Sequence, residues 1–262
     1  MRALRTICGA ALLLGLLSTR THAQMPVTSV ASPTEPIQWK GYSDFTLGLG
    51  VVPVRLNEIN AVLQQAGYGT LPNTFTTYNM SFQRQSRPRP WSLPYELGVS
   101  INSPVTANGT NQVRAGLFFY RLNFQYVILR TERLRLAPLL GVGSTLLTMN
   151  VAKLNAPAPS LASVLANPGN AQSVNLTTVD VGFNVGMAAN YQIPTGGITT
   201  NCEYAHQNLI VLGLNAGYRL GNRTGMDPNH EVSVANPSVQ FAGWYASLRV
   251  GIGTRYGRTT QP

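Results

Sequence analysis

The feature that most constrains this chain is an alternation of side chains that repeats from Phe45 to Ile252. In its clearest copy, residues 179–190, Val, Phe, Met and Ala on one parity alternate mostly with Asp, Gly and Asn on the other. Because successive side chains of a strand point to opposite faces, such a segment gives one apolar face and one small polar face. The apolar face must meet either a protein core or lipid.

The alternation predicts an all-β fold of about eight strands. These strands are expected at about residues 44–54, 76–83, 95–102, 118–126, 134–143, 179–190, 210–219 and 242–252. An even count is what a closed antiparallel up-and-down barrel in a single chain requires. Residues 198–207 alternate weakly and fit either an extended strand or a turn.

One short amphipathic helix is expected in the first connection, from Leu56 to Ala66. Apolar residues recur there at helical spacing, and Gly67 provides a natural stop. The apolar stripe has two interpretations: a partner-binding or lid element at the mouth of the barrel, or a structural cap that covers its end. The cap is favoured.

The first 23 residues have the pattern of a secretory signal peptide. Arg2 and Arg5 precede an apolar run that ends at Leu17, and cleavage is expected between Ala23 and Gln24. The run is shorter than the roughly 20 residues that a spanning helix needs. The remaining organisation is expected to be a flexible periplasmic leader over residues 24–43, the barrel over residues 44–256 and a tail over residues 257–262.

Charge and cysteine content narrow the function classes. Loss of three arginines with the signal peptide leaves 16 basic residues against 9 acidic ones, a net charge of +7. The basic residues are scattered, which argues against a nucleic-acid partner. Arginine fits contacts with phosphate-bearing lipid or glycolipid, or equally a solvated surface. Only Cys202 survives processing, so no disulfide within the chain is available.

The lengths of strands and connections favour a membrane barrel. Each strand is about ten residues long, close to the roughly 9–11 that a tilted strand needs to cross the hydrocarbon. With the first strand running outward, the outer loops span residues 55–73, 103–111, 150–173 and 221–237, and the inner turns span residues 85–93, 130–133 and 194–207. Long loops on one side and short turns on the other are typical of such barrels. Charged residues make up only 11% of the chain, below the about 25% of soluble proteins.

Parity assigns residues to the two faces of the expected barrel. The polar parity carries interior charges at Asp44, Glu96, Arg121, Arg135, Asp180, Arg219 and Arg249. The interior of an eight-stranded barrel is just filled by side chains, so opposite charges are expected to pair across the lumen. The apolar parity is expected to face lipid at Phe118, Tyr120, Val181, Phe183, Val185, Leu212, Leu214, Trp244 and Leu248. Glycines on the interior parity would let the strands coil tightly.

With this signal peptide and these strands, the chain resembles small outer-membrane β-barrel proteins of Gram-negative bacteria. The resemblance covers about residues 44–256 and includes a terminal stretch similar to the barrel-assembly signal, with Arg249, Gly251 and Tyr256 at its polar, glycine and aromatic places. Thr254 stands where a hydrophobic residue is usual. The resemblance implies residence in the outer membrane, with lipid, glycolipid and the barrel-assembly machinery as partners; an extracellular ligand is unknown.

The sequence predicts no cofactor, no metal site and no catalytic residue. His206 and His230 lack metal-ligand spacing, and no phosphate-binding loop occurs. The leading hypothesis is a non-enzymatic barrel with a packed polar interior and long outer loops in a structural or surface-interaction role. Two alternatives stay open: a barrel-borne lipid-modifying enzyme that uses Glu203 and His206, and a soluble secreted β-sandwich with Leu212, Leu214 and Leu248 in its core.

Overall fold

The computed structural model describes residues 37–86, 89–101, 103–154, 173–201, 204–225, 227–228 and 237–259. The chain divides into two units, Met1–Thr34 and Glu35–Pro262, and every described residue lies in the second. The expected signal peptide, its cleavage site at Ala23 and Gln24, and residues 24–36 of the expected leader lie outside the described residues.

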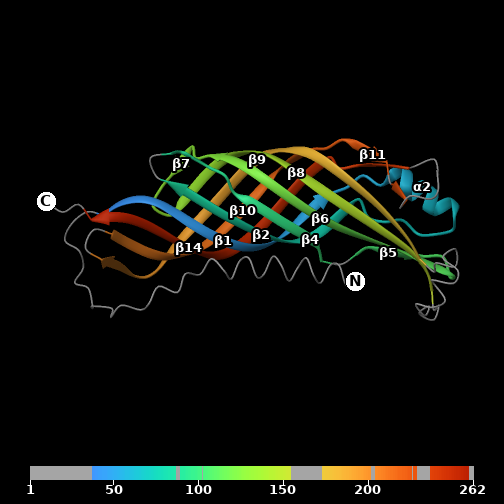
Figure 1. Cartoon of the computed structure of the whole chain (residues 1–262), viewed down its shortest axis with the longest axis horizontal. Coiled ribbons are helices and arrows are strands. Elements are labelled where there is room, and N and C mark those ends of the chain that lie inside the picture. Colours follow the sequence, from blue (N-terminus) through green and yellow to red (C-terminus); the bar gives the residue numbers. More distant parts are fainter. Residues whose placement is uncertain are drawn as a thin grey trace. The chain divides into compact units, whose positions relative to one another are not determined.

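Eight antiparallel strands form a closed ring in the second unit (Figure 1). In ring order they are β1 (Ile37–Pro53), β2 (Thr74–Ser86), β4 (Tyr95–Ser100), β6 (Asn111–Tyr126), β8 (Leu134–Lys153), β9 (Ser173–Asn201), β10 (Tyr204–Leu220) and β14 (Gly243–Thr259). The last strand pairs with the first, with Phe45 opposite Ile252, and this pairing closes the ring. The all-β barrel and the count of eight are confirmed. The two-sheet sandwich is wrong, because a single sheet closes on itself.

Short elements extend the two ends of the ring. They are α2 (Asn57–Gln65), β3 (Trp91–Ser92), β5 (Val105–Ala107), β7 (Leu129–Arg130), β11 (Arg223–Gly225), β12 (Asp227–Pro228) and β13 (Ser238–Gln240). We call the end where β1 begins and β14 finishes the terminal end, and the opposite end the helix end, because β1 leads there into α2 (Figure 1). The amphipathic helix of the first connection is therefore confirmed, with bounds one residue inside the expected ones at each end.

Several strands run further than the alternation indicated. β1 begins at Ile37, so the expectation that residues 37–43 belong to a flexible leader is wrong; these residues pair with the end of β14. The inner turn expected at residues 194–207 is also largely strand: β9 continues to Asn201 and β10 starts at Tyr204. Thr200 pairs with Ala205, and Ala205 pairs with Gly257 of β14. Pairing on both edges of β10 thus sustains strand structure where the sequence pattern is weak.

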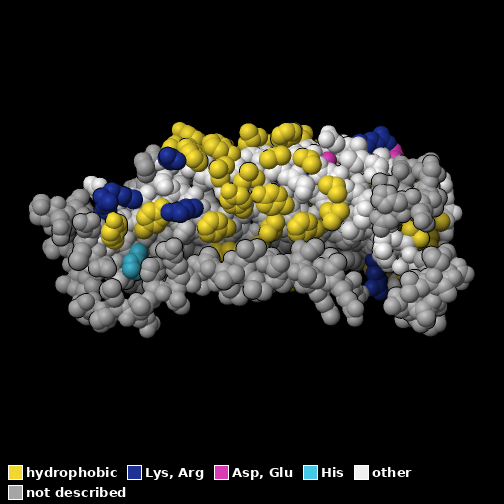
Figure 2. Space-filling model, viewed as in Figure 1, with side chains coloured by type: hydrophobic (Ala, Val, Ile, Leu, Met, Phe, Trp, Pro, Cys, Tyr) yellow, Lys and Arg dark blue, Asp and Glu magenta, His cyan; other side chains and the backbone are white. Residues whose placement is uncertain are grey.

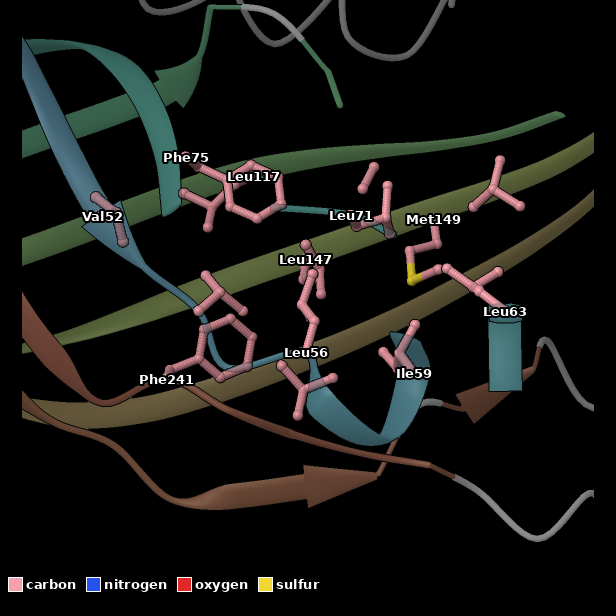
Figure 3. Close-up of a cluster of buried hydrophobic side chains, with 14 of the residues drawn as sticks. Val52, Leu56, Ile59, Leu63, Leu71, Phe75, Leu117, Leu147, Met149 and Phe241 are labelled. Atoms are coloured by element: carbon pink, nitrogen blue, oxygen red, sulfur yellow. The ribbon is translucent and has the colours of Figure 1, made fainter. Parts of the chain in front are cut away.

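The buried apolar core occupies the helix end of the ring (Figure 3). Its members are Val52, Val54, Leu56, Ile59, Leu63, Leu71, Phe75, Val113, Ala115, Leu117, Phe119, Leu147, Met149, Val239 and Phe241, a set that we call the plug. From α2, Ile59 and Leu63 enter the plug, because residues four apart lie on one face of a helix. The side chain of Asn60 holds the segment between α2 and β2 against the helix. Its Nδ2 donates to the Leu71 carbonyl at 2.9 Å, and its Oδ1 accepts from the Leu71 amide at 2.8 Å.

Candidate functional site

The outer surface of the ring carries a belt of exposed apolar side chains. Figure 2 shows hydrophobic side chains gathered over the middle of the barrel, with Lys and Arg toward its ends. Of the residues expected to face lipid, all but Phe118 are large and exposed, from 38% for Tyr120 to 77% for Trp244; Phe118 is half-buried on the same parity. Leu49, Leu248 and Leu214 lie side by side on three consecutive strands. Soluble monomers rarely expose an apolar surface of this extent, which suits contact with lipid.

Aromatic pairs mark the two ends of this belt. At the helix end, Tyr218 and Trp244 meet edge to face with ring centroids 5.4 Å apart. At the terminal end, Trp91 stacks on Phe124 at 6.3 Å. Aromatic girdles at two levels are typical of barrels whose ends meet the two membrane–water interfaces.

The interior of the ring is polar in its middle and apolar at the helix end. Six of the seven charged residues expected inside are at least 94% buried, and Arg135 is half-buried. The packed polar interior that parity predicts is found in the middle of the ring but not beside α2, where the plug fills the lumen with Val, Leu, Phe and Met side chains. The sequence feature that could have indicated the plug is a pair of adjacent apolar residues, such as Val51 and Val52 or Phe118 and Phe119. One member of each pair faces outward and the other faces the lumen.

Two ion pairs lie in the polar middle of the lumen. Arg219 Nη2 lies 2.8 Å from Asp180 Oδ2, and both side chains are fully buried. The other oxygen of Asp180 accepts the Asn222 amide at 2.9 Å. Arg121 Nη1 lies 3.8 Å from Glu96 Oε2, and these two residues are direct partners in the register of β4 and β6. Both pairs join adjacent strands, not opposite walls of the lumen as expected.

Two of the remaining interior charges donate hydrogen bonds to neutral amide oxygens. Arg249 Nη2 donates to Asn215 Oδ1 at 2.8 Å, and the Arg135 guanidinium donates to Gln85 Oε1 at 3.2 Å. Asp44 is 5% exposed, and among the described residues its Oδ2 has no hydrogen-bond partner.

A single carboxylate fastens α2 to the segment that leads into β14, the ring neighbour of β1. Glu58 Oε2 accepts hydrogen bonds from the Ser238 amide at 2.7 Å and from the Ser238 hydroxyl at 2.6 Å. Its Oε1 forms an ion pair with Arg223. The helix is thereby attached to the antiparallel pair of β11 and β13. Sequence reasoning missed Glu58, because no pattern links residues about 180 positions apart.

Of the residues weighed for catalysis, His206 alone lies in the part of the chain that the structure describes. His206 is exposed on the outer face of β10, while Glu203, Cys202 and His230 lie outside the described residues. Among the residues that the structure describes, no group of three or more His, Cys, Asp and Glu could hold a metal ion. Within the same residues, no helix is long and apolar enough to cross a membrane.

The residues that resemble an assembly signal lie along β14, which closes the ring. Arg249 points into the lumen, Gly251 pairs with Thr46 of β1, and Tyr256 packs against Gly41. A β-carbon on Gly251 would stand 2.0 Å from the carbonyl oxygen of Phe45. The glycine is therefore required by the close approach of β1, independently of any role in assembly.

The closed ring, the apolar belt and the aromatic ends together define a transmembrane β-barrel. No protein-family model and no curated protein matches the chain. Several solved structures do match, all of bacterial outer-membrane proteins. Ail, the attachment invasion locus protein of Yersinia pestis, is 10% identical over 82% of this chain and 99% of its own, with a TM-score of 0.39. The outer membrane protease OmpT of Escherichia coli is 8% identical over 87% and 100%, with a TM-score of 0.36. A major outer membrane protein of Thermus thermophilus is 10% identical over 81% and 98%, with a TM-score of 0.39.

Proposed function

We propose that this chain is an integral outer-membrane barrel without enzymatic activity, which serves a structural or surface-interaction role through the segments at its helix end. The terminal end would face the periplasm, because the connections there, from β2 to β4, from β6 to β8 and from β9 to β10, are shorter than those at the helix end. The helix end, with α2 and the antiparallel pair of β11 and β13, would face the exterior.

The observation that carries this proposal is the plug. A conducting barrel needs a continuous polar path, whereas here the lumen beside α2 is filled by buried apolar side chains from five strands, the connections next to them and the helix. Leu147 and Val113 are fully buried there, and Phe75 is 1% exposed. A lumen closed in this way supports a role on the outer surface in preference to a role in transport.

Two measurements test the proposal. The full chain should fractionate with the outer membrane, require detergent for extraction and migrate differently on a gel before and after heating. After insertion into a planar bilayer it should give no steady conductance. A detergent-independent soluble monomer, or a stable open channel from the unmodified chain, would contradict the proposal.

The absence of catalysis has its own test. The exposed position of His206 on the lipid-facing side gives it no described carboxylate partner for hydrolase chemistry. Cells that carry His206→Ala should therefore show the same lipid composition as cells that carry the unmodified chain. A changed lipid profile would restore the enzymatic hypothesis.

A further inference from the structure

The terminal end of the lumen contains a cavity of about 620 Å³. Residues from β1, β2, β7, β8, β9 and β14 line it. The cavity is therefore the opening of the lumen at the terminal end and not a groove between two strands. Its volume lies within the roughly 300–1,000 Å³ of small-molecule sites. Its walls differ from the plug at the other end, because they include three arginines and the two aromatic rings of Trp39 and Tyr42.

Positive charge dominates the walls of this cavity. Three arginines, Arg130, Arg135 and Arg255, line it together with one carboxylate, the exposed Glu132. Within the part of the chain that the structure describes, the formal charges of the lining residues therefore sum to +2. Asp44 lies further along β1 toward the middle of the lumen and is not part of the lining.

Aromatic rings hold two of these arginines in place. The Arg135 guanidinium lies 3.4 Å from the ring centroid of Tyr42, and that of Arg255 lies 4.2 Å from the ring of Trp39. Arg255 Nε also donates to Gln207 Oε1 at 2.8 Å. A guanidinium stacked by its face keeps its N–H donors in the plane of the fork, which is the arrangement that recognises phosphate and carboxylate.

A buried amide adds a second, independent sign of a ligand. Gln192 lines the cavity and is 2% exposed, and its Nε2 has no hydrogen-bond partner among the described residues. A buried donor without an acceptor is unfavourable, so such groups are normally satisfied by a ligand or water. The side-chain amide nitrogen of Gln192 is a hydrogen-bond donor, so the ligand group that satisfies it must be an acceptor.

We propose that this cavity binds the phosphate group of a small organic molecule or of a lipid headgroup. A phosphate monoester carries about −1.5 to −2 charges at neutral pH and offers only acceptor oxygens, which matches walls of charge +2 that present donors. A ligand with one carboxylate would neutralise only half of the +2 charge of the walls. The rings of Trp39 and Tyr42 and the side chain of Ile37 provide apolar surface for the organic part. Binding does not depend on the surface role proposed above. The orientation proposed with that role only determines which compartment the cavity faces.

Titration calorimetry on the full chain, refolded in a phosphate-free non-ionic detergent, tests this assignment. Phenyl phosphate represents a free ligand and short-chain phosphatidic acid represents a lipid headgroup. We expect saturable binding of at least one, with one site per chain. Arg255→Gln should weaken it about tenfold or more, because a charge-assisted hydrogen bond is lost. Gln192→Leu should weaken it without changing the charge.

Arg84→Gln is the matched control. Arg84 precedes the cavity residue Gln85 in β2 but is exposed on the outer face, so the variant removes the same charge from the same end of the barrel. It should change the dissociation constant by less than twofold, and heat-dependent migration should verify that each variant is folded. Binding of phosphatidic acid alone would identify the source as lipid. The proposal is overturned if neither probe saturates, if Arg84→Gln weakens binding as much as Arg255→Gln, or if folded Arg255→Gln and Gln192→Leu both bind normally.

Discussion

Arg219 and Arg223 are four residues apart, yet their ion pairs lie in opposite environments. The pair of Arg219 with Asp180 is fully buried in the lumen, whereas in the pair with Glu58 the side chain of Arg223 is 66% exposed. Water screens the exposed pair, so it contributes little to stability. The buried pair is different, because loss of one partner leaves an uncompensated charge in a medium of low polarity.

These two arginines allow a matched prediction. Arg219→Gln should lower the free energy of unfolding by about 3–5 kcal/mol, because Asp180 then loses its charged partner. Arg223→Gln should lower it by about 1 kcal/mol or less. Urea unfolding of the refolded barrel in micelles, followed by tryptophan fluorescence, measures both. Equal losses of unfolding free energy in the two variants would show that burial does not decide how much each ion pair contributes to stability.

At this scale the sequence predicted faces but not partners. Parity alone placed Glu96 and Arg121 in the interior, since the side chains of a strand have a period of two. Their contact depends on the register of β4 against β6, which sets Glu96 directly opposite Arg121. Register is fixed by turns and by packing across strands, so a single strand's pattern does not contain it.

At the scale of elements, α2 shows how a nine-residue helix can be stable. Helices of this length are marginal in water by themselves, and most of their stability comes from packing of one face. Ile59 and Leu63 supply that face, and Glu58 fastens the first turn to β13. The spacing of apolar residues predicted the helix, but not the plug that receives it. Where β6 and β8 are apolar on both faces, the alternation disappears.

Substitutions in α2 compare how much its buried face and its exposed face contribute to stability. Leu63→Ala should cost about 2–5 kcal/mol, because it opens a cavity in the plug. Val62 is 52% exposed, and Val62→Ala should change stability by about 0.5 kcal/mol or less. Thermal unfolding in detergent measures the two. If α2 opens separately from the barrel, faster hydrogen exchange confined to residues 57–65 of the Leu63 variant will reveal it; unchanged stability and exchange would contradict the packing.

A second prediction concerns the contact of β1 with β14. Gly251→Ala should cost about 1–3 kcal/mol or prevent folding, because the new methyl group meets the backbone of Phe45 and Thr46. Gly197→Ala is the control, since a β-carbon there meets no atom within 4 Å. The fraction refolded, read from heat-dependent migration, compares the two. Equal yields would mean that the strands can separate slightly at little cost.

At the scale of the whole molecule, the belt predicts which substitutions a bilayer rejects. Leu248 is 66% exposed between Leu49 and Leu214. Leu248→Arg should destabilise the barrel in lipid vesicles by about 2–4 kcal/mol, the cost of arginine near the middle of a bilayer. Gln38→Arg, near the start of β1, should have little effect. Refolding into vesicles of defined thickness measures the difference, and equal tolerance of both would argue against a lipid-facing belt.

The join between β1 and β14 sets the order in which the molecule can be completed. Residues about 200 positions apart meet there, so a growing chain carries an unpaired edge on β1 until its last strand arrives. A chain that stopped before Gly243 would present a second open edge on β10. Hydrocarbon offers no hydrogen bonds to either edge. A chain that lacks the C-terminal strand therefore keeps two unpaired strand edges. It is not stable in the bilayer, even when its first seven strands are formed.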